Sequence, residues 1–248
     1  MIAEATIVMV MTTTIRRAQD RFHTQIDWLD SWHSFSFGPH YDAENTHHGL
    51  LRVVNDDVIA PGAGFGTHSH RDMEIVTWVL EGAIEHRDSA GNHGIIEPGL
   101  AQRMSAGSGI AHSEMNASAT AAAHLVQMWV LPDTEGIEPG YEQLSVGNAL
   151  ATGELVPVAS GQGHEGAITI HQKDAVLWVG RLAANKTVTV PDAPHVHVYV
   201  ARGSATLSGA DGDVGDLGEG DAARLTDAGS PRLTAGADGT EVIVWQTA

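Results

Sequence analysis

Short runs of β-branched and aromatic residues, separated by glycine-rich turns, are the feature that most restricts the fold of this chain. Runs such as EIVTWVL, HLVQMWVL, HVHVYVA and EVIVWQ alternate with turn sequences such as PGAGFG, DSAGNHG and SAGSG. Many short strands joined by tight turns are typical of β-barrels and β-sandwiches. Helical periodicity is scarce, and the best candidate for a short helix or turn is QIDWLDSW, residues 25–32. The sequence therefore predicts an all-β fold.

A break in the strand pattern divides the chain. The segment PDTEGIEPGYEQLSVGNALATGEL, residues 132–155, is rich in Pro, Gly and acidic residues, and we interpret it as the connection between two β domains. A chain of 248 residues is long enough for two domains of ordinary size. The order of strands and turns in the first half partly recurs in the second, as two tandem barrels would leave. We predict domains over residues 15–140 and 155–248.

Two short motifs place side chains that bind metals on single strand faces. His68 and His70 are two residues apart in GFGTHSHRDMEIVTWVLEG, and His112 and Glu114 are two apart in SGIAHSEMN. Because successive side chains of a β-strand point to opposite faces, each pair projects from one face. Imidazole and carboxylate ligands suit divalent iron, copper, nickel, manganese or zinc. The two motifs together predict a metal site.

The residues around these two pairs make the prediction of a metal site more specific. With 15 histidines in the chain, chance alone would produce about one pair of histidines two residues apart. The first pair, however, follows closely spaced glycines and precedes Glu74 and Gly82, and the second lies within a G-x-x-H-x-E-x-N arrangement from Gly109 to Asn116.

These motifs resemble the two motifs of the cupins, and the longer stretches resemble the pirin family. The stretches are WLDSWHSFSF, LRVVNDDVI, GFGTHSHRDMEIVTWVLEG, EHRDSAGN and MSAGSGIAHSEMN, which together are similar to the bacterial pirins described as quercetin 2,3-dioxygenases. The similarity runs in register from about residue 15 to residue 141 and more loosely to the end. It implies a bicupin, with two tandem cupin β-barrels of the double-stranded β-helix type.

The resemblance also implies where the metal is bound. One divalent transition metal, expected to be Fe(II), would be held in the N-terminal barrel by three histidines and one glutamate, here His68, His70, His112 and Glu114. Cu, Ni, Mn and Zn fit the same ligand set. Many other cupins take the carboxylate from the place of Glu74, so Glu74 remains the alternative ligand to Glu114. If it is not a ligand, Glu74 is a candidate hydrogen-bond partner of a ligating histidine.

The other histidines are not predicted to form a second site. His195 and His197 in PHVHVYVARG lie on a different part of their strand from the first pair, and the last third of the chain has no counterpart of GxxHxE. The C-terminal domain is therefore predicted to be degenerate and free of metal. His33 is interpreted first as a packing residue that could reach the pocket mouth. The remaining histidines, which include His47, His48, His86 and His93, are predicted to lie at the surface.

Composition excludes several other functions. The chain has no cysteine, so disulfides, thiolate metal sites and cysteine nucleophiles are excluded. The formal net charge of −18 disfavours nucleic-acid binding. The first eleven residues, MIAEATIVMVM, have no basic region and are too short for a membrane helix, so we predict neither a signal peptide nor a membrane anchor. A soluble, cytoplasmic protein is expected, with a monomer as the default.

The resemblance implies a metal-dependent dioxygenase that cleaves the flavonol quercetin at the 2,3-position and releases carbon monoxide. Glu114 is the candidate catalytic base for the flavonol hydroxyl, and a flavonol and dioxygen are the expected partners. Two alternatives stay open. One is a non-enzymatic, pirin-type metal-binding regulator that acts through a protein partner, and the other is a cupin oxygenase with a different substrate.

Overall fold

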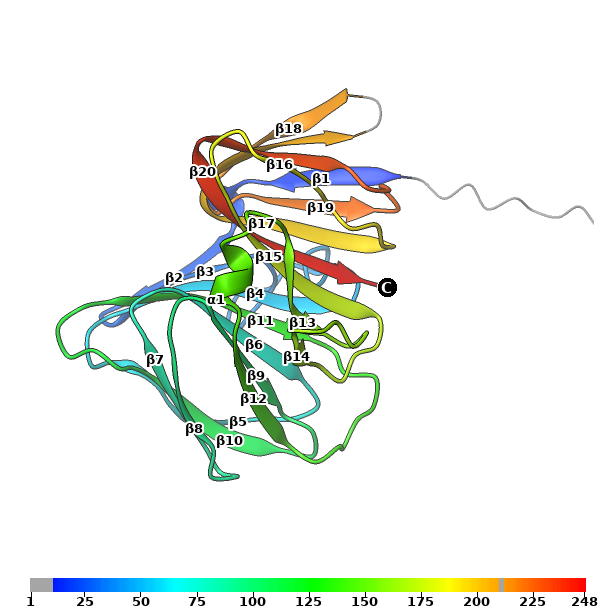
Figure 1. Ribbon diagram of the computed structural model, residues 1–248. Helices are drawn as coiled ribbons and strands as arrows, with labels where there is room; N and C mark the ends of the chain where they lie inside the picture. The colour runs from blue at the N-terminus through cyan, green and yellow to red at the C-terminus, as the bar shows by residue number, and fades with distance from the viewer. Residues whose placement is uncertain (1–10, 210–211) are drawn as a thin grey trace, which may run out of the picture.

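The computed structural model describes residues 11–209 and 212–248, which form two β-barrels in tandem (Figure 1). Strands dominate this part of the chain. The helical elements within it are a four-residue α-helix, α1 (Gly147–Leu150), and a 3-10 turn, η1 (Ala18–Asp20). No helix in these two ranges is long and apolar enough to cross a membrane. The all-β prediction is confirmed. The prediction of neither a signal peptide nor a membrane anchor rests on residues 1–11, of which 1–10 lie outside the described ranges.

Two sheets form the N-terminal barrel. The larger sheet contains, in spatial order, β12 (Gly140–Ser145), β9 (Leu100–Ser105), β6 (Glu74–Glu81), β11 (Ala123–Val130), β4 (Leu51–Ile59), β3 (Leu29–His33) and β2 (Phe22–Ile26). The smaller sheet contains β5 (Gly64–His70), β10 (Ile110–Asn116), β7 (Ile84–Asp88) and β8 (His93–Ile96). The motif histidines are on β5 and β10, so the smaller sheet carries them.

One nine-stranded sheet forms the C-terminal barrel. Its main path is β1 (Thr12–Arg16), β19 (Ala222–Thr226), β17 (His195–Gly209), β20 (Arg232–Thr247), β15 (Ala175–Leu182), β13 (Val156–Ser160) and β14 (Ile168–Thr169), with β16 (Thr187–Thr189) beside β20 and β18 (Gly212–Gly218) beside β17. The first described strand, β1, thus lies in the second barrel, where it pairs antiparallel with β19 (Figure 1). Residues 15 and 16 of the predicted N-terminal domain belong to this strand.

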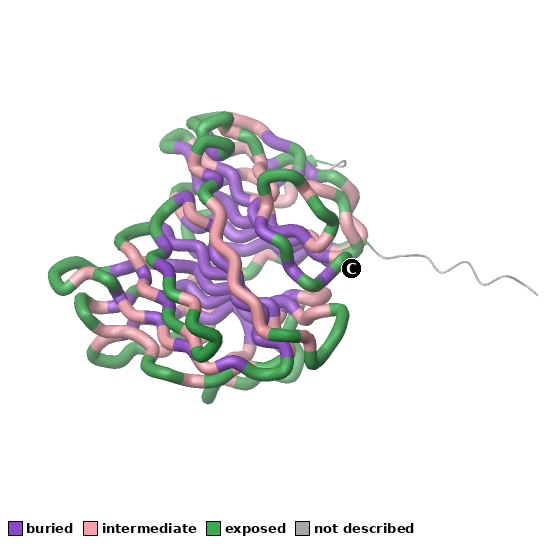
Figure 2. Tube along the Cα trace, turned by 60° about the horizontal axis from the view of Figure 1, so that its bottom comes forward, coloured by how far each residue is buried: buried purple, intermediate pink, exposed green. Residues whose placement is uncertain are grey.

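The largest hydrophobic core joins the two barrels. Its buried members include Val76, Trp78, Val126 and Met128 of the first barrel and Leu177, Val179, Tyr199 and Trp245 of the second. Figure 2 shows that buried segments cross the middle of the molecule. Trp78 Nε1 also donates a hydrogen bond to Glu241 Oε1 at 2.8 Å. Because burial of apolar surface is the main stabilising contribution, this shared core holds the barrels together.

Two segments discussed above have defined structure. The segment 25–32, expected to be a short helix or a turn, contains a turn at residues 27–28 and no helix, and it lies in the hairpin of β2 and β3. The burial alternates along β3, with Leu29, Ser31 and His33 buried and the residues between them less so, which is the period of a strand. The predicted connection 132–155 contains β12 and α1, and β12 pairs with β9.

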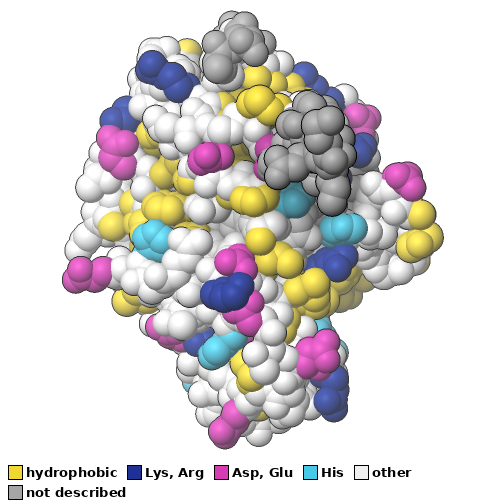
Figure 3. Space-filling model, turned by 90° about the vertical axis from the view of Figure 1, so that its right-hand side faces the viewer, with side chains coloured by type: hydrophobic (Ala, Val, Ile, Leu, Met, Phe, Trp, Pro, Cys, Tyr) yellow, Lys and Arg dark blue, Asp and Glu magenta, His cyan; other side chains and the backbone are white. Residues whose placement is uncertain are grey.

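The acidic surplus of the chain is spread out on the face that Figure 3 presents. There, Asp and Glu side chains are scattered among neutral and basic ones and do not gather in a single acidic patch. An interspersed surface of this kind favours solubility and gives no strong local field on this face.

Candidate metal centre

Three histidines converge where β5 and β10 pair. His68 and His70 are on β5 and are partly exposed, whereas His112 on β10 is buried. The strand register sets His112 directly opposite His68, and their Nε2 atoms are 3.1 Å apart. Together with His70, ligand atoms of all three residues lie within 4.8 Å of one another. Two nitrogens bound to one ion at about 2.1 Å and at right angles would be about 3.0 Å apart, so this spacing fits one metal ion.

The glycine before the first histidine pair permits this approach of the strands. A Cβ atom on Gly64 would lie 2.3 Å from the carbonyl oxygen of Glu114 and 2.6 Å from the Cα of Met115. Any side chain at residue 64 would therefore push β5 away from β10. The β-bulge between His112 and Glu114 lies in the same strand pair.

The free ring nitrogens of the site face inward. His68 Nδ1 donates to the carbonyl oxygen of Gly66 at 2.8 Å, so in the neutral ring Nε2 is the nitrogen whose lone pair can bind a metal. His70 Nε2 is buried and has no hydrogen-bond partner within the described part of the chain. A buried ring nitrogen without a partner is costly unless a ligand occupies it. The residues therefore fit a bound metal ion.

The local environment keeps the ring nitrogens neutral. Burial, followed by the neighbouring His112 and His68, lowers the pKa of His70 to about 4. Burial, followed by His68 and His86, lowers the pKa of His112 to about 3. Neutral imidazole is the form that binds metals, so at neutral pH neither ring has to lose a proton first.

Glu114 lies beside the histidines and is held by two donors. Thr77 Oγ1 donates to Glu114 Oε1 at 3.2 Å, and Gln127 Nε2 donates to Glu114 Oε2 at 2.6 Å. Gln127 is itself fixed, because Trp129 Nε1 donates to its Oε1 at 3.0 Å. The three-histidine group does not include Glu114, which instead lies within 4.8 Å of ligand atoms of His86 and His112.

The prediction that His86 lies at the surface is wrong. Its side chain is fully buried on β7, directly opposite Glu114 in the pairing of β7 with β10. His86 Nδ1 is 3.4 Å from His112 Nδ1, and His86 Nε2 is 3.3 Å from Asp88 Oδ2. The polar sequence EHRD conceals this role, because only the pairing between distant strands brings His86 to His112. His48 is also not fully at the surface, since it is half-buried and bonds to the carbonyl of Leu225, whereas His47 and His93 are exposed.

Glu74, the alternative carboxylate, lies elsewhere. It is buried on β6, where its Oε2 accepts hydrogen bonds from Ser105 Oγ at 2.9 Å and from the backbone N–H of His171 at 3.0 Å. Ser105 ends β9 of the first barrel, His171 follows β14 of the second, and neither group of potential metal ligands includes Glu74. The geometry therefore favours Glu114 as the carboxylate of the centre.

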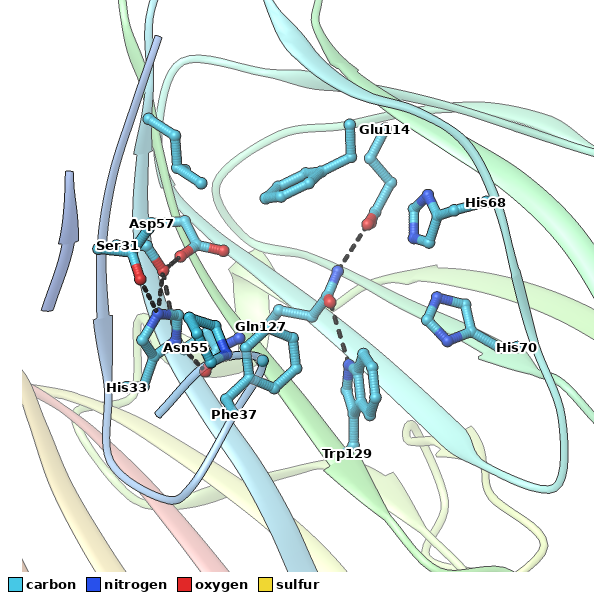
Figure 4. Close-up of a pocket in the computed structure, with 15 residues that line it drawn as sticks. Ser31, His33, Phe37, Asn55, Asp57, His68, His70, Glu114, Gln127 and Trp129 are labelled. Carbon is cyan, nitrogen blue, oxygen red and sulfur yellow. Dashed lines mark hydrogen bonds between the residues drawn. The ribbon is translucent and has the colours of Figure 1, made fainter. Parts of the chain in front are cut away.

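A cavity of about 260 Å³ opens beside the centre. Its aromatic and aliphatic lining comes from Leu29, Phe37, Phe65 and Trp129, and its polar lining includes Ser31, His33, Asn55, Asp57, His68, His70, Glu114 and Gln127. Figure 4 shows His68, His70 and Glu114 on one side and Ser31, His33, Asn55 and Asp57 on the other. His33 is therefore part of the cavity wall as well as packed, since its ring stacks against Phe37.

The histidine pair of the second barrel has a different setting. His197 is fully buried, its ring lies 5.7 Å from that of Phe35, and both of its ring nitrogens lack a hydrogen-bond partner within the described residues. Burial lowers the pKa of His197 well below its usual value. Within residues 11–209 and 212–248, both groups of potential metal ligands lie in the first barrel.

Comparisons with known proteins agree with this architecture. The Pirin family model matches residues 14–130, and the model of the quercetinase C-terminal cupin domain matches residues 157–245. A Mycobacterium tuberculosis protein provisionally named a quercetin 2,3-dioxygenase is 54% identical over 239 residues, 96% of each chain. The quercetin 2,3-dioxygenase of Escherichia coli K12 is 42% identical over 203 residues, 82% of this chain and 87% of that protein.

The chain is also similar to solved structures over nearly its whole length. The crystal structure of YhhW from Escherichia coli has a TM-score of 0.88 and 37% identity, and the alignment covers 96% of this chain and 98% of that one. A second structure, described as the bacterial pirin YhhW in complex with nickel(II), has a TM-score of 0.86 and 36% identity, with 95% and 99% coverage.

Proposed function

Since the chain belongs to the pirin family, with two tandem cupin barrels, we propose that it is a metal-dependent dioxygenase that cleaves quercetin at the 2,3-position and releases carbon monoxide. One observation carries the proposal. Three histidines converge beside a buried, hydrogen-bonded carboxylate at one side of an aromatic-lined cavity. The names of the relatives support the reaction, and the nickel(II) complex of YhhW supports a divalent metal.

The proposed ligands are His68, His70 and His112, with Glu114 as the fourth. When bound, a divalent metal of this kind supplies a Lewis acid and a redox partner for dioxygen chemistry, and Fe(II) is our expected metal. The Nδ1 atom of His112 contacts His86 Nδ1, and the Nδ1 atom of His68 donates to the carbonyl oxygen of Gly66. Such outer hydrogen bonds fix the ring orientation of a ligating histidine.

Glu114 has a second proposed role as the base for the flavonol 3-hydroxyl. A carboxylate at the edge of the cavity can take this proton at hydrogen-bond range and so make the flavonol electron-rich. The donors Gln127 and Thr77 hold the two carboxylate oxygens in place before substrate arrives. Phe65 and Trp129 provide flat apolar walls for the substrate rings and keep water from the reacting carbons.

The test is anaerobic reconstitution with Fe(II), followed by addition of quercetin and dioxygen while flavonol absorbance and carbon monoxide are measured together. Repeated turnovers with release of carbon monoxide are expected. Iron-loaded, folded protein that turns over no quercetin would contradict the proposal. The regulatory alternative would then be favoured if metal-free protein still bound a protein partner.

The buried pair His86 and Asp88 provides a prediction about metal affinity. Replacing His86 with phenylalanine should keep its stacking on Tyr141 but remove the acceptor of the His112 Nδ1–H. We expect the affinity for divalent metal to fall about 10- to 100-fold, as for other losses of such outer partners. Competition with a chromogenic chelator measures this change.

A matched control is available on the neighbouring strand. His93 is an exposed histidine on β8 that pairs with Glu85, away from His112. His93→Phe should leave the metal affinity within about twofold. Equal affinities of the His86→Phe protein and wild type would show that His112 needs no support from His86.

A further inference from the structure

Two polar pairs face the cavity from the side opposite the metal centre. Ser31 and His33 on β3 are directly opposite Asp57 and Asn55 on β4. All four side chains are between 1% and 4% exposed and line the cavity. Figure 4 shows them across the cavity from His68, His70 and Glu114. Four polar side chains in a buried strand pair are costly unless hydrogen bonds satisfy them.

Each pair satisfies only part of its hydrogen-bonding capacity. Ser31 Oγ donates to Asp57 Oδ1, and His33 Nδ1 donates to Asn55 Oδ1 at 2.9 Å, while His33 Nε2 contacts Thr24 Oγ1 at 3.0 Å. In the described chain, no hydrogen bond uses Asn55 Nδ2 or Asp57 Oδ2. Neither atom is among those sealed from solvent, so both remain available from the cavity.

The charge state of this wall restricts what it can bind. Burial raises the pKa of Asp57 to about 7, with opposition from the Ser31 hydrogen bond and support from the nearby Asp56. Burial lowers the pKa of His33. Among the described residues, no arginine or lysine lines the cavity. A wall without a fixed cation is poorly suited to a carboxylate or phosphate, whereas a neutral hydroxyl can accept from Asn55 and share a proton with Asp57.

The space between the two sides suits a flat ligand. Phe37, Phe65 and Trp129 line the cavity between the polar pairs and the histidines, and its volume of about 260 Å³ is slightly below the range of about 300–1,000 Å³ for small-molecule sites. A ligand that fills the cavity therefore meets the metal centre at one end and the polar pairs at the other.

We propose that the Ser31–Asp57 and His33–Asn55 pairs form a second subsite, which binds a hydroxyl group on the substrate ring farthest from the metal centre. The proposal rests on the function proposed above and deepens it. It assigns the preferred substrate class as planar polyphenols that carry hydroxyl groups at both ends, and not flavonols in general. Asn55 and Asp57 are the specificity-determining residues.

The experiment compares two flavonols with the Fe(II)-loaded protein. Quercetin carries two hydroxyls on its pendant ring, and galangin carries none but has the same 3-hydroxyl end. Dissociation constants are measured anaerobically by flavonol absorbance, and kcat/KM is measured with dioxygen. Wild type should favour quercetin by about tenfold in both quantities, since one hydrogen bond of average strength accounts for a factor of that size.

Substitutions at Asp57 then test the cause of the preference. Asp57→Leu, which keeps the shape, should bring the ratio of the dissociation constants for galangin and quercetin from about tenfold down to near one. Asp57→Asn keeps a donor and an acceptor and should retain the preference. Ser31→Ala is the milder second variant, in case the leucine variant does not fold, and it should reduce the preference in part.

The outcomes separate this inference from the proposed function. Equal treatment of quercetin and galangin by wild type, with both bound, would overturn the subsite and leave the dioxygenase proposal in place. Failure of the loaded protein to bind or turn over either flavonol would overturn both. A preference that survives both Asp57→Leu and Ser31→Ala would place the hydroxyl against another wall and also overturn the subsite.

Discussion

Replacing His70 with alanine should strip most of the metal from the protein and reduce turnover to a trace. His70 Nε2 is buried and unpartnered in the described chain, and burial with two neighbouring histidines keeps its ring neutral. Loss of one of the three histidine ligands should weaken metal binding by more than about 100-fold. That is the upper limit for loss of a residue that only hydrogen-bonds to a ligand. Metal content after gel filtration, measured by mass spectrometry, gives the occupancy.

The fold should survive this change. His70 is at the end of β5 and partly exposed, and it is not part of a hydrophobic core cluster. The metal-free variant and metal-free wild type should therefore melt within a few degrees of each other, because the substitution removes no member of a hydrophobic core cluster and takes away a buried, unpaired ring nitrogen. A variant that keeps full occupancy would refute the assignment of His70 as a ligand.

Replacing Glu114 with glutamine should lower the turnover rate to about 1% of the wild-type rate or less. Loss of a positioned base typically costs about 10²- to 10⁴-fold in rate. The amide keeps the size of the carboxylate and still offers an oxygen to Gln127, so the fold should be retained. Oxygen uptake with quercetin measures the rate, and metal content measured in parallel separates loss of the base from loss of the ion.

Glu74→Gln is the matched control. Glu74 is a buried glutamate of the same barrel whose partners are Ser105 and the backbone of His171, away from the metal centre. Its replacement should only weaken turnover, by less than about tenfold, through the packing at the barrel junction. If Glu74→Gln were the inactive variant and Glu114→Gln the active one, the two roles would have to be exchanged.

The two pairs of candidate ligands could be predicted from the sequence, because the alternation of side chains along a strand depends only on neighbouring residues. The two-residue spacing within each motif is sufficient to place His68 with His70, and His112 with Glu114, on single faces. Glycine-rich turns between β-branched runs likewise indicate strands wherever they occur, which is why the all-β class is confirmed. These features need no knowledge of which strands are neighbours.

The remaining features depend on strand register, which is set by contacts between distant residues. The alternation of side chains along a strand allowed both Glu74 and Glu114 as the carboxylate. The pairing of β10 with β7 and β5 brings Glu114 beside His86 and His112, which the sequence alone does not show. The same pairing turns His86 inward, although its sequence neighbours are polar. Asn55 and Asp57 look like ordinary polar residues in LRVVNDDVI until β3 is aligned beside them.

The position of β1 affects how the protein is made. Roughly 200 residues separate β1 from its partner β19, so the earliest described strand leaves the ribosome long before the strand that completes its pairing. At about 5–20 residues per second, the delay is about 10–40 s. During that time β1 has free backbone groups that can pair with another chain. We therefore expect that two nascent copies made close together can exchange this strand, and that a protein truncated before β19 would keep β1 without its partner.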